Sequence, residues 1–370
     1  MPDLQLIDID AEAYYNNAIQ KMEIASGEPL YPGDQRRIFT EALIEVLVGM
    51  ANKCNIACNS KFLDNAEGDA LDALGARSNT IRIAAAPAVA TFEFNLSAAV
   101  LTDTVIPAGT MITTDGDVNF ATNEDLTIAA GDTKGTVIAT CTAAGEEGNG
   151  YIAGSVAQLV DSITNVESAI NTETTFGGSD EEDDDTYRER IRIAPSSFST
   201  AGPEKAYIYW AKSASATIQD VVVDIPSVCT VNLYILCKGG QLPNAALLAL
   251  VEASCSASDR RPITDYVTAL APTTVTYNIE ITYYTTAEDE EACEETIEGE
   301  GGAVDQYIAW QSGAIGRDIN PDKLRALCLS PESGTGCIRI DVTSPARAEV
   351  DPLKVGIIGT TSVTKEVVEE

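Results

Sequence analysis

The chain contains no histidine among its 370 residues. This absence excludes Ser-His-Asp and Cys-His catalysis, and it excludes metal sites built on imidazole ligands. Basic residues are also few, because 23 Lys and Arg stand against 57 Asp and Glu and leave a formal net charge of −34. A surface that is so acidic repels phosphate backbones and anionic lipids, so we expect neither nucleic acid nor a membrane as a partner.

Signals for cysteine pairing and for export are missing too. The nine cysteines are odd in number, and no two of them have Cys-x-x-Cys spacing. No apolar run approaches the roughly 18 residues of a membrane span, and the N-terminus lacks the features of a signal peptide. We therefore expect a chain made in a reducing cytoplasm, with free thiols and no bound metal.

The sequence also lacks the motifs that mark common active sites. A Gly-x-Ser-x-Gly elbow, a Walker loop and a dinucleotide fingerprint are all absent. Paired carboxylates carry no information in a chain with so many acids, and no cysteine lies in a setting that would activate its thiol. We predict no catalytic residues, no cofactor and no small-molecule substrate, and hence a protein that is not an enzyme.

Helical periodicity dominates the N-terminal segment. Tyr31-Pro32-Gly33-Asp34 is typical of a turn, and Asp34 is expected to cap a helix that begins at Gln35 or Arg36 and runs to about Phe62. The apolar face of this helix is expected to pack either on a helix at 11–25 in the same chain or on a helix of another chain. A shorter helix at 68–75 is predicted to end at Gly75, in the role of C-cap. The residues expected at an intermolecular helix bundle are Leu43, Val46, Leu47, Met50, Cys54 and Ala57.

From residue 88 the apolar period changes from 3.6 to 2. Short alternating runs, separated by Gly-rich turns every 8–12 residues, predict a compact antiparallel β domain that extends to residue 178. Gly177 and Gly178 then form a predicted hinge, because glycine adopts backbone angles closed to other residues. The six acids at 180–185 are expected to begin a solvated helix, where negative charge suits the helix dipole.

Helical and strand patterns alternate in the rest of the chain. A helix at 203–213, strands at 218–223 and 230–236, a helix at 244–257 and a strand at 274–284 predict a small α+β sandwich. The last 80 residues have the pattern of a second, looser copy. The predicted fold is a multidomain α+β protein with N-terminal long helices (1–87), a central antiparallel β domain (88–178) and two small α+β sandwich domains (179–285 and 286–370).

Over about residues 31–285 the sequence resembles the baseplate J family, the wedge proteins of contractile phage tails and related phage-tail-like bacteriocins. Each stretch that carries the resemblance is short, and their order and spacing make it specific. The stretches are Tyr31–Ile38, Gly68–Gly75, Ile106–Thr110, Phe120–Thr122, Ala144–Gly150, Gly177–Glu182, Arg188–Ile191, Phe198–Pro203 and Arg261–Asp265.

The resemblance implies a structural protein that joins wedge sectors around the tail hub and rearranges on contraction. Its implied partners are a second copy of itself, other baseplate wedge proteins and the hub. The implied location is the bacterial cytoplasm during assembly and the baseplate of the released particle afterwards. Two alternative functions are a surface adhesin built from β and α+β modules, and a glycan hydrolase that uses paired carboxylates.

Overall fold

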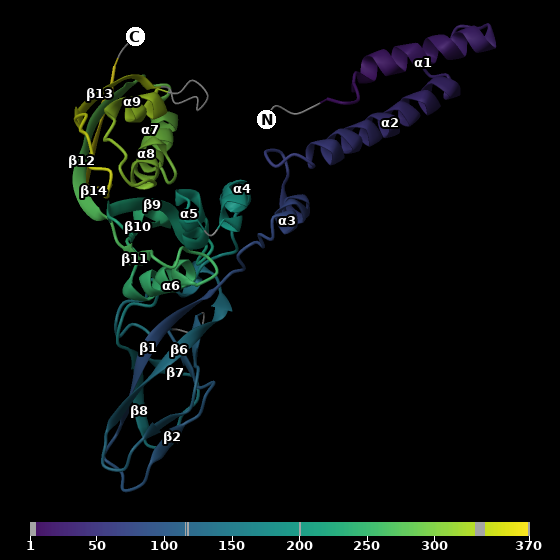
Figure 1. Ribbon diagram of the computed structural model, residues 1–370. Helices are drawn as coiled ribbons and strands as arrows, with labels where there is room; N and C mark the ends of the chain where they lie inside the picture. The colour runs from purple at the N-terminus through teal and green to yellow at the C-terminus, as the bar shows by residue number, and fades with distance from the viewer. Residues whose placement is uncertain (1–4, 115, 117, 200, 330–336, 369–370) are drawn as a thin grey trace. The chain divides into compact units, whose positions relative to one another are not determined.

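The computed structural model describes residues 5–114, 116, 118–199, 201–329 and 337–368 (Figure 1). These residues form two compact units. The first, unit 1, holds the described residues up to Arg82 together with Asp183–Pro195, and the second, unit 2, holds Ile83–Glu182 and the residues from Ser196 onward. The mixed α+β, multidomain architecture confirms the predicted fold class. Among the described residues, no helix is both long enough and apolar enough to cross a bilayer.

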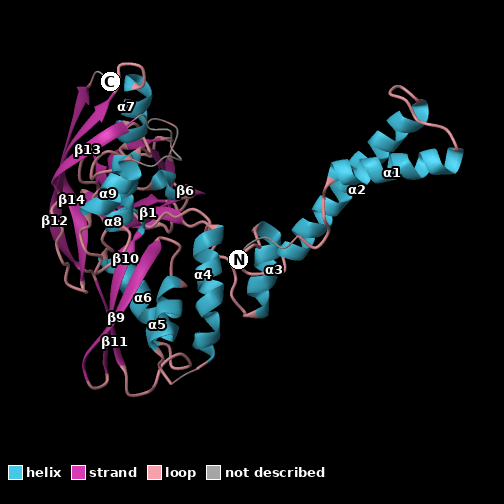
Figure 2. Cartoon of the chain, turned by 90° about the horizontal axis from the view of Figure 1, so that it is seen from above, coloured by secondary structure: helices cyan, strands magenta, loops and turns pink. Residues whose placement is uncertain are grey.

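Unit 1 is helical, and its first two helices lie side by side as an antiparallel hairpin (Figures 1 and 2). Asp34 caps the second helix as predicted, since its carboxylate accepts a hydrogen bond from the backbone N–H of Arg36 at 2.8 Å. Asn55 ties the preceding segment to this helix, because its side chain both accepts from and donates to the backbone of Ile7. The helices are α1 (Ala11–Ser26), α2 (Gln35–Asn59), α3 (Gly68–Arg77) and α4 (Asp184–Ile193).

The predicted C-cap role of Gly75 is wrong. Helix α3 continues to Arg77 and is capped by Ser78, so Gly75 lies inside it. A Cβ atom at this position would stand 2.0 Å from the Tyr187 hydroxyl oxygen and 2.7 Å from the Thr80 carbonyl oxygen. Glycine is therefore required here by the close approach of α4, whose Tyr187 belongs to the small core of this part of the unit.

The β domain of unit 2 consists of a six-stranded sheet in the order β7-β3-β4-β6-β1-β8 and a separate β2-β5 pair. All of the paired strands are antiparallel, which confirms the predicted β domain, while its boundaries at 88 and 178 stay predictions. Strand β1 alternates between half-buried and buried residues, and Phe92 and Phe94 enter the core with Phe120. The strands are β1 (Pro87–Leu96), β2 (Thr104–Ile106), β3 (Met111–Thr113), β4 (Asn119–Thr122), β5 (Leu126–Ile128), β6 (Lys134–Ala144), β7 (Gln158–Leu159) and β8 (Val166–Asn171).

Two α+β domains follow, each with a three-stranded mixed sheet. In the first, β10 pairs antiparallel with β9 and parallel with β11, and α5 and α6 cover the sheet. In the second, β12 pairs antiparallel with β13 and parallel with β14. The elements are α5 (Glu204–Lys212), β9 (Ile218–Ser227), β10 (Thr230–Cys237), α6 (Ala245–Ser256), β11 (Tyr266–Leu270), β12 (Thr273–Thr285), α7 (Glu290–Glu298), α8 (Ala303–Ser312), α9 (Pro321–Cys328), β13 (Cys337–Ser344) and β14 (Lys354–Val367), with 3₁₀ turns at Glu146–Gly148, Ala194–Phe198 and Lys238–Gly240.

The two α+β domains share an architecture but not a chain order. Helix α6 connects the parallel strands β10 and β11, whereas α7, α8 and α9 connect the antiparallel strands β12 and β13. The predicted second copy of the first α+β domain is therefore present only in its architecture, a three-stranded mixed sheet with helices, and not in the order of its elements along the chain. The domains contact each other, since Ile315 packs with Leu236 and Val355 and its backbone N–H donates to Asp220 Oδ2 at 2.9 Å.

We predict that Gly75→Ala loosens α3 and α4. The added methyl must displace the buried Tyr187 hydroxyl, and overpacking of this kind costs about 2 kcal/mol, or roughly 30-fold faster amide exchange. Hydrogen exchange of peptides covering 68–77 and 184–193 measures the effect. Gly49→Ala is the matched control, because nothing lies within 4 Å of its Cβ position on α2. Unchanged protection in Gly75→Ala would contradict the packing argument.

Candidate assembly interface

The six predicted interface residues lie on one side of α2 and are all exposed. Val46 and Met50 have exposed fractions of 60% and 58%, and those of Leu43 and Leu47 are close to one half. The hairpin partner α1 thus exists, but it covers a different side of α2, where Thr40, Ala51 and Asn55 are buried. Of the two predicted partners, the intramolecular one is present and leaves the apolar stripe uncovered.

Helical geometry defines the width of this stripe. At about 100° per residue, the positions from Leu47 to Val46 span roughly 100° of the helix surface, directly beside the side that contacts α1. Phe39 lies on the same stripe and is 68% exposed. It was not among the six predicted residues. Phe39, Leu43, Val46 and Met50 follow one another at spacings of four, three and four residues, which are typical of a helix–helix seam. This spacing was the sequence signal that could have added Phe39 to the predicted set.

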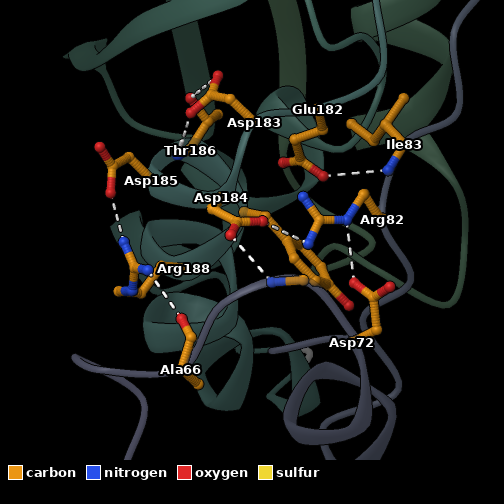
Figure 3. Close-up of polar contacts among 12 residues, drawn as sticks. Ala66, Asp72, Arg82, Ile83, Glu182, Asp183, Asp184, Asp185, Thr186 and Arg188 are labelled. Atoms are coloured by element: carbon orange, nitrogen blue, oxygen red, sulfur yellow. Dashed lines mark hydrogen bonds and ion pairs between the residues drawn. The ribbon is translucent and has the colours of Figure 1, made fainter. Parts of the chain in front are cut away.

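The acidic run after the β domain is a set of specific contacts, and not only a solvated helix start (Figure 3). Asp183 caps α4 by accepting from the Thr186 backbone N–H at 2.9 Å. Asp184 accepts from the Gly68 backbone N–H at 3.0 Å. In unit 2, the Glu182 carboxylate accepts from the Ile83 backbone N–H at 3.0 Å and is itself buried. Short-range sequence patterns could not reveal the partners of Asp184 and Glu182, which lie 116 and 99 residues away.

Arg82 is the centre of the polar cluster in unit 1 (Figure 3). Its guanidinium reaches Asp72 at 2.9 Å and Asp184 at 2.7 Å, and it lies over the Tyr187 ring at 4.6 Å from the ring centroid. Burial lowers the pKa of Arg82, but hydrogen bonds to Asp184 and Asp72 outweigh it and leave the pKa raised. The hydrogen bond from the Gly68 N–H lowers the pKa of the Asp184 carboxyl, and Arg82 lowers it further. Burial acts in the opposite direction but does not outweigh them. These shifts favour the charged forms of Arg82 and Asp184 at neutral pH.

Helix α4 also supplies donors to carbonyl groups that no helix or strand satisfies. Arg188 donates from Nε to the Leu63 carbonyl and from Nη2 to the Ala66 carbonyl, both at 2.9 Å. The Tyr187 hydroxyl donates to the Thr80 carbonyl at 2.8 Å. Because buried backbone oxygens need partners, α4 fixes the loops on both sides of α3.

The predicted hinge residues lie within unit 2. Gly177 has a φ of +88°, a conformation that favours glycine. Gly178 is closely packed, because a Cβ atom there would stand 2.4 Å from the Gly145 carbonyl oxygen, and Asn149 hydrogen-bonds both its N–H and its C=O. The division between the units instead falls between Glu182 and Asp183. Flexing at Gly177 and Gly178 stays a prediction, and this packing opposes it.

Two segments of the chain match known families. Residues 90–178 match the Baseplate J-like protein barrel domain, and residues 199–271 match the Baseplate J-like central domain. Both segments are thus similar to domains of the baseplate J-like family. A stretch of 104 residues is 35% identical to "Baseplate protein J" of Escherichia phage P2, which is 28% of this chain and 34% of that protein, so the alignment spans about a third of the relative.

Among solved structures, the cryo-EM structure of the anti-feeding prophage (AFP) baseplate contains a similar chain. The match covers 94% of the present chain and 90% of that chain, at 12% sequence identity and a TM-score of 0.41. A TM-score of this size is too low to relate the two folds.

The stretches that resemble the baseplate J-like family make contacts with one another. Gly109 donates to the Thr122 carbonyl at 2.8 Å and Thr122 donates back to the Thr110 carbonyl at 3.0 Å, which joins two of these stretches at one turn. In the central domain, the Tyr207 hydroxyl donates to Asp265 Oδ2 at 2.5 Å across a pocket. Burial, with Asp265, raises the pKa of Tyr207, so this tyrosine stays protonated as a structural donor. Thr200, part of another stretch, lies outside the described residues.

Metal binding finds no support in the described part of the chain, where no three side chains of His, Cys, Asp or Glu are grouped to hold an ion. The exposed apolar stripe on α2 is the feature of the described residues on which the proposal below is built.

We predict that Asp184→Asn destabilises the packing of α4 at neutral pH by about 1 kcal/mol, because the ion pair with the partly buried Arg82 is lost, while the exposure of the site moderates the cost. Urea unfolding followed through exchange of the α4 peptide measures the change. Asp185→Asn is the matched control, since that side chain is 93% exposed and pairs only with Arg188 on its own helix. Equal stabilities of the two variants would refute a role for the Arg82 cluster.

Proposed function

We propose that the chain is a structural component of the baseplate of a contractile tail or contractile injection particle, and that it is not an enzyme. The observation that carries the proposal is the exposed apolar stripe on α2, in a chain whose β and central domains match baseplate J-like domains. An unpartnered apolar face of this length is typical of a subunit that completes its core on assembly.

The proposed partners of the stripe are α2 of a second copy of this chain and a helix of another baseplate wedge protein, packed together as a bundle. The spacing of the apolar residues fits such a seam, in which each side chain inserts between residues of the facing helix. The formal net charge of −34 also favours apolar contacts, because two copies with this charge repel each other and gain little binding energy from contacts between their polar surfaces. The hub and the neighbouring wedge sectors are proposed as further partners, through the other domains.

The proposed life cycle begins in the bacterial cytoplasm, where the wedges assemble, and ends in the baseplate of a released particle. A baseplate must hold one arrangement and then widen, so its subunits need rigid parts with few joints. The chain passes between the two compact units at Arg82/Ile83, Glu182/Asp183 and Pro195/Ser196, which are therefore the proposed joints. The pair Gly177 and Gly178 is the competing position.

We predict that Leu47→Asp combined with Met50→Lys blocks wedge assembly and leaves the β domain folded. Burial of unpaired charges at a helix seam costs several kcal/mol, which is enough to abolish association. Co-expression with the neighbouring wedge proteins, followed by sedimentation and electron microscopy, shows whether sectors form.

The matched control is Glu45→Lys combined with Asn52→Asp. It introduces the same two residue types on the same helix, but at exposed positions on the side of α2 away from the stripe. This control should assemble normally. Normal assembly of the stripe variant, or failure of both variants, would argue against the stripe as the interface.

We predict that residues 178–182 move with the β domain, and not with α4, when the particle contracts. The bridges Val89–Phe176 and Ala86–Ser179 hold this segment to the first strand, whereas Asp183 and Asp184 bind within unit 1. Comparison of cryo-EM structures of extended and contracted particles tests this directly. Movement of residues 178–182 together with α4 would place the joint at Gly177 and Gly178.

A further inference from the structure

A small pocket lies in the first α+β domain, between the start of α5, the β9–β10 hairpin and the turn that ends at Asp265. It has a volume of about 130 Å³, which is room for several water molecules or for one long side chain. Apolar and acidic side chains line it together. Those that matter for its chemistry are Glu204, Tyr207, Val223, Ile225, Val231 and Asp265.

The Asp265 carboxylate is held in place at this pocket. Its Oδ2 atom accepts a hydrogen bond from the Tyr207 hydroxyl at 2.5 Å. The guanidinium of Arg261 fixes the turn by donating to the carbonyl groups of Pro262 and Asp265. Gly202 lets the chain before α5 come close, because a Cβ atom there would stand 3.0 Å from the Pro262 ring and 3.2 Å from Asp265 Oδ2. A carboxylate that is already fixed loses little freedom when it binds a partner.

Two carboxylates of the pocket keep capacity for a further partner. An ionised carboxylate accepts about four hydrogen bonds, and that of Asp265 receives two from described residues, Tyr207 and Thr264. Glu204 is exposed, and its carboxylate has no hydrogen bond or ion pair with any residue that the structure describes. Two negative charges beside apolar walls suit the side chain of lysine or arginine, which has a charged end and an apolar stem.

Exposed apolar side chains lie next to the pocket and form an apolar rim, defined here as Ile225, Val228, Ile263 and Tyr266. Each of the four has an exposed fraction of 67% or more. Ile225 lines the pocket itself, and the other three lie one or two residues from lining residues in the sequence. Such a rim offers contact area to a protein segment, and it therefore favours a side chain of a partner protein over a free amine.

We propose that this pocket receives one lysine or arginine side chain of a neighbouring protein, with the charge beside Glu204 and Asp265 and the stem against Val223 and Val231. The partner is a protein other than a second copy of this chain, because two copies that each have a formal net charge of −34 repel each other. The proposal rests on the proposed function only for its setting, since an assembled particle supplies the neighbour. The pocket belongs to a different domain from the stripe on α2.

The first test uses the purified full-length chain and NMR of labelled valine and isoleucine methyl groups. The probes are N-acetyl-lysine N-methylamide and N-acetyl-arginine N-methylamide, and N-acetyl-norleucine N-methylamide is the uncharged control. We expect the cationic probes to shift the methyl signals of Val223, Ile225 and Val231 saturably, with millimolar dissociation constants. Their binding should weaken in 1 M sodium chloride, because salt screens an exposed charge pair. The norleucine probe should bind at least about tenfold more weakly.

Variants of the two acids test the role of charge. Glu204→Gln changes an exposed side chain and should weaken binding of the cationic probes about threefold, and its combination with Asp265→Asn should weaken it about tenfold. An asparagine at the second position can still accept from the Tyr207 hydroxyl, so the turn is kept. The matched control is Glu252→Gln, which removes the same charge from an exposed position on α6 of the same domain and should leave the affinity unchanged. Absence of saturable shifts, equal binding of the norleucine probe, or unchanged affinity in both pocket variants would overturn the proposal.

The second test identifies the partner in assembled particles. Ile225 is replaced by the photo-cross-linker p-benzoylphenylalanine, and the linked peptides are mapped by mass spectrometry after irradiation. We expect a link to another particle protein, within a few residues of a lysine or arginine, and no such link from the same cross-linker at Glu252. A link to a second copy of this chain, a link to a segment without a basic residue, or no link at all would overturn the proposal. Particles that assemble with the pocket unoccupied would remove this inference and leave the proposed function intact.

Discussion

The contact of Arg82 with Asp72, Asp184 and the Tyr187 ring is the constraint on which the helical unit depends. The chain leaves this unit after Arg82 and returns at Asp183, with the whole β domain inserted between the two points. Bringing together two points separated by about a hundred residues has an entropic cost, which grows slowly with the length of the loop. Contacts at the point of closure must offset this cost. A guanidinium held by two carboxylates and stacked on a buried ring supplies such contacts, and its neighbours are the residues through which the chain enters and leaves the inserted domain.

The same unit leaves much of its apolar surface exposed. Its hairpin of α1 and α2 has few buried apolar side chains, with Ile19 on α1 and Ala51 on α2, while most large apolar residues of α2 remain exposed. Helices gain most of their stability from packing an apolar face, and a hairpin with so small a core is at best marginal by itself. The start of α2 is stabilised locally by the cap at Asp34. Hydrogen bonds from the Arg36 side chain and backbone lower the pKa of the Asp34 carboxyl and favour its charged form. Local interactions define where α2 begins, while its apolar face stays exposed in this chain and is covered only in the proposed assembly.

Sequence reasoning succeeded where the determining contacts are local and failed where they are distant. The start of α2 and the alternation of β1 follow from a cap and a period of two, and both could be predicted. The role of Gly75 could not, because its determinant is a tyrosine 112 residues away. The acidic run does begin a helix as predicted, with Asp183 as the cap of α4. The distant partners of Glu182 and Asp184, which lie at residues 68–83, could not be predicted from a run of negative charge. The shared face of the six residues proposed for the interface could be predicted from the helix period, and the structure shows that all six are exposed, while their role in an interface stays a prediction.

The acidic surface of the chain limits which of its faces can contact another copy. With 57 acids against 23 bases, neighbouring copies repel each other wherever their surfaces are polar, although salt limits this repulsion to about 8 Å at physiological ionic strength. Several of the few basic side chains are engaged by acids within the chain, since Arg82 pairs with Asp72 and Asp184 and Arg192 pairs with Asp64, which reduces the basic surface that could attract a partner. Apolar faces are not subject to this repulsion, and their contact strengthens rather than weakens as salt is raised. Under the proposed function, the polar surfaces of this acidic chain would oppose non-specific association, and the apolar stripe on α2 would define where contact is favourable.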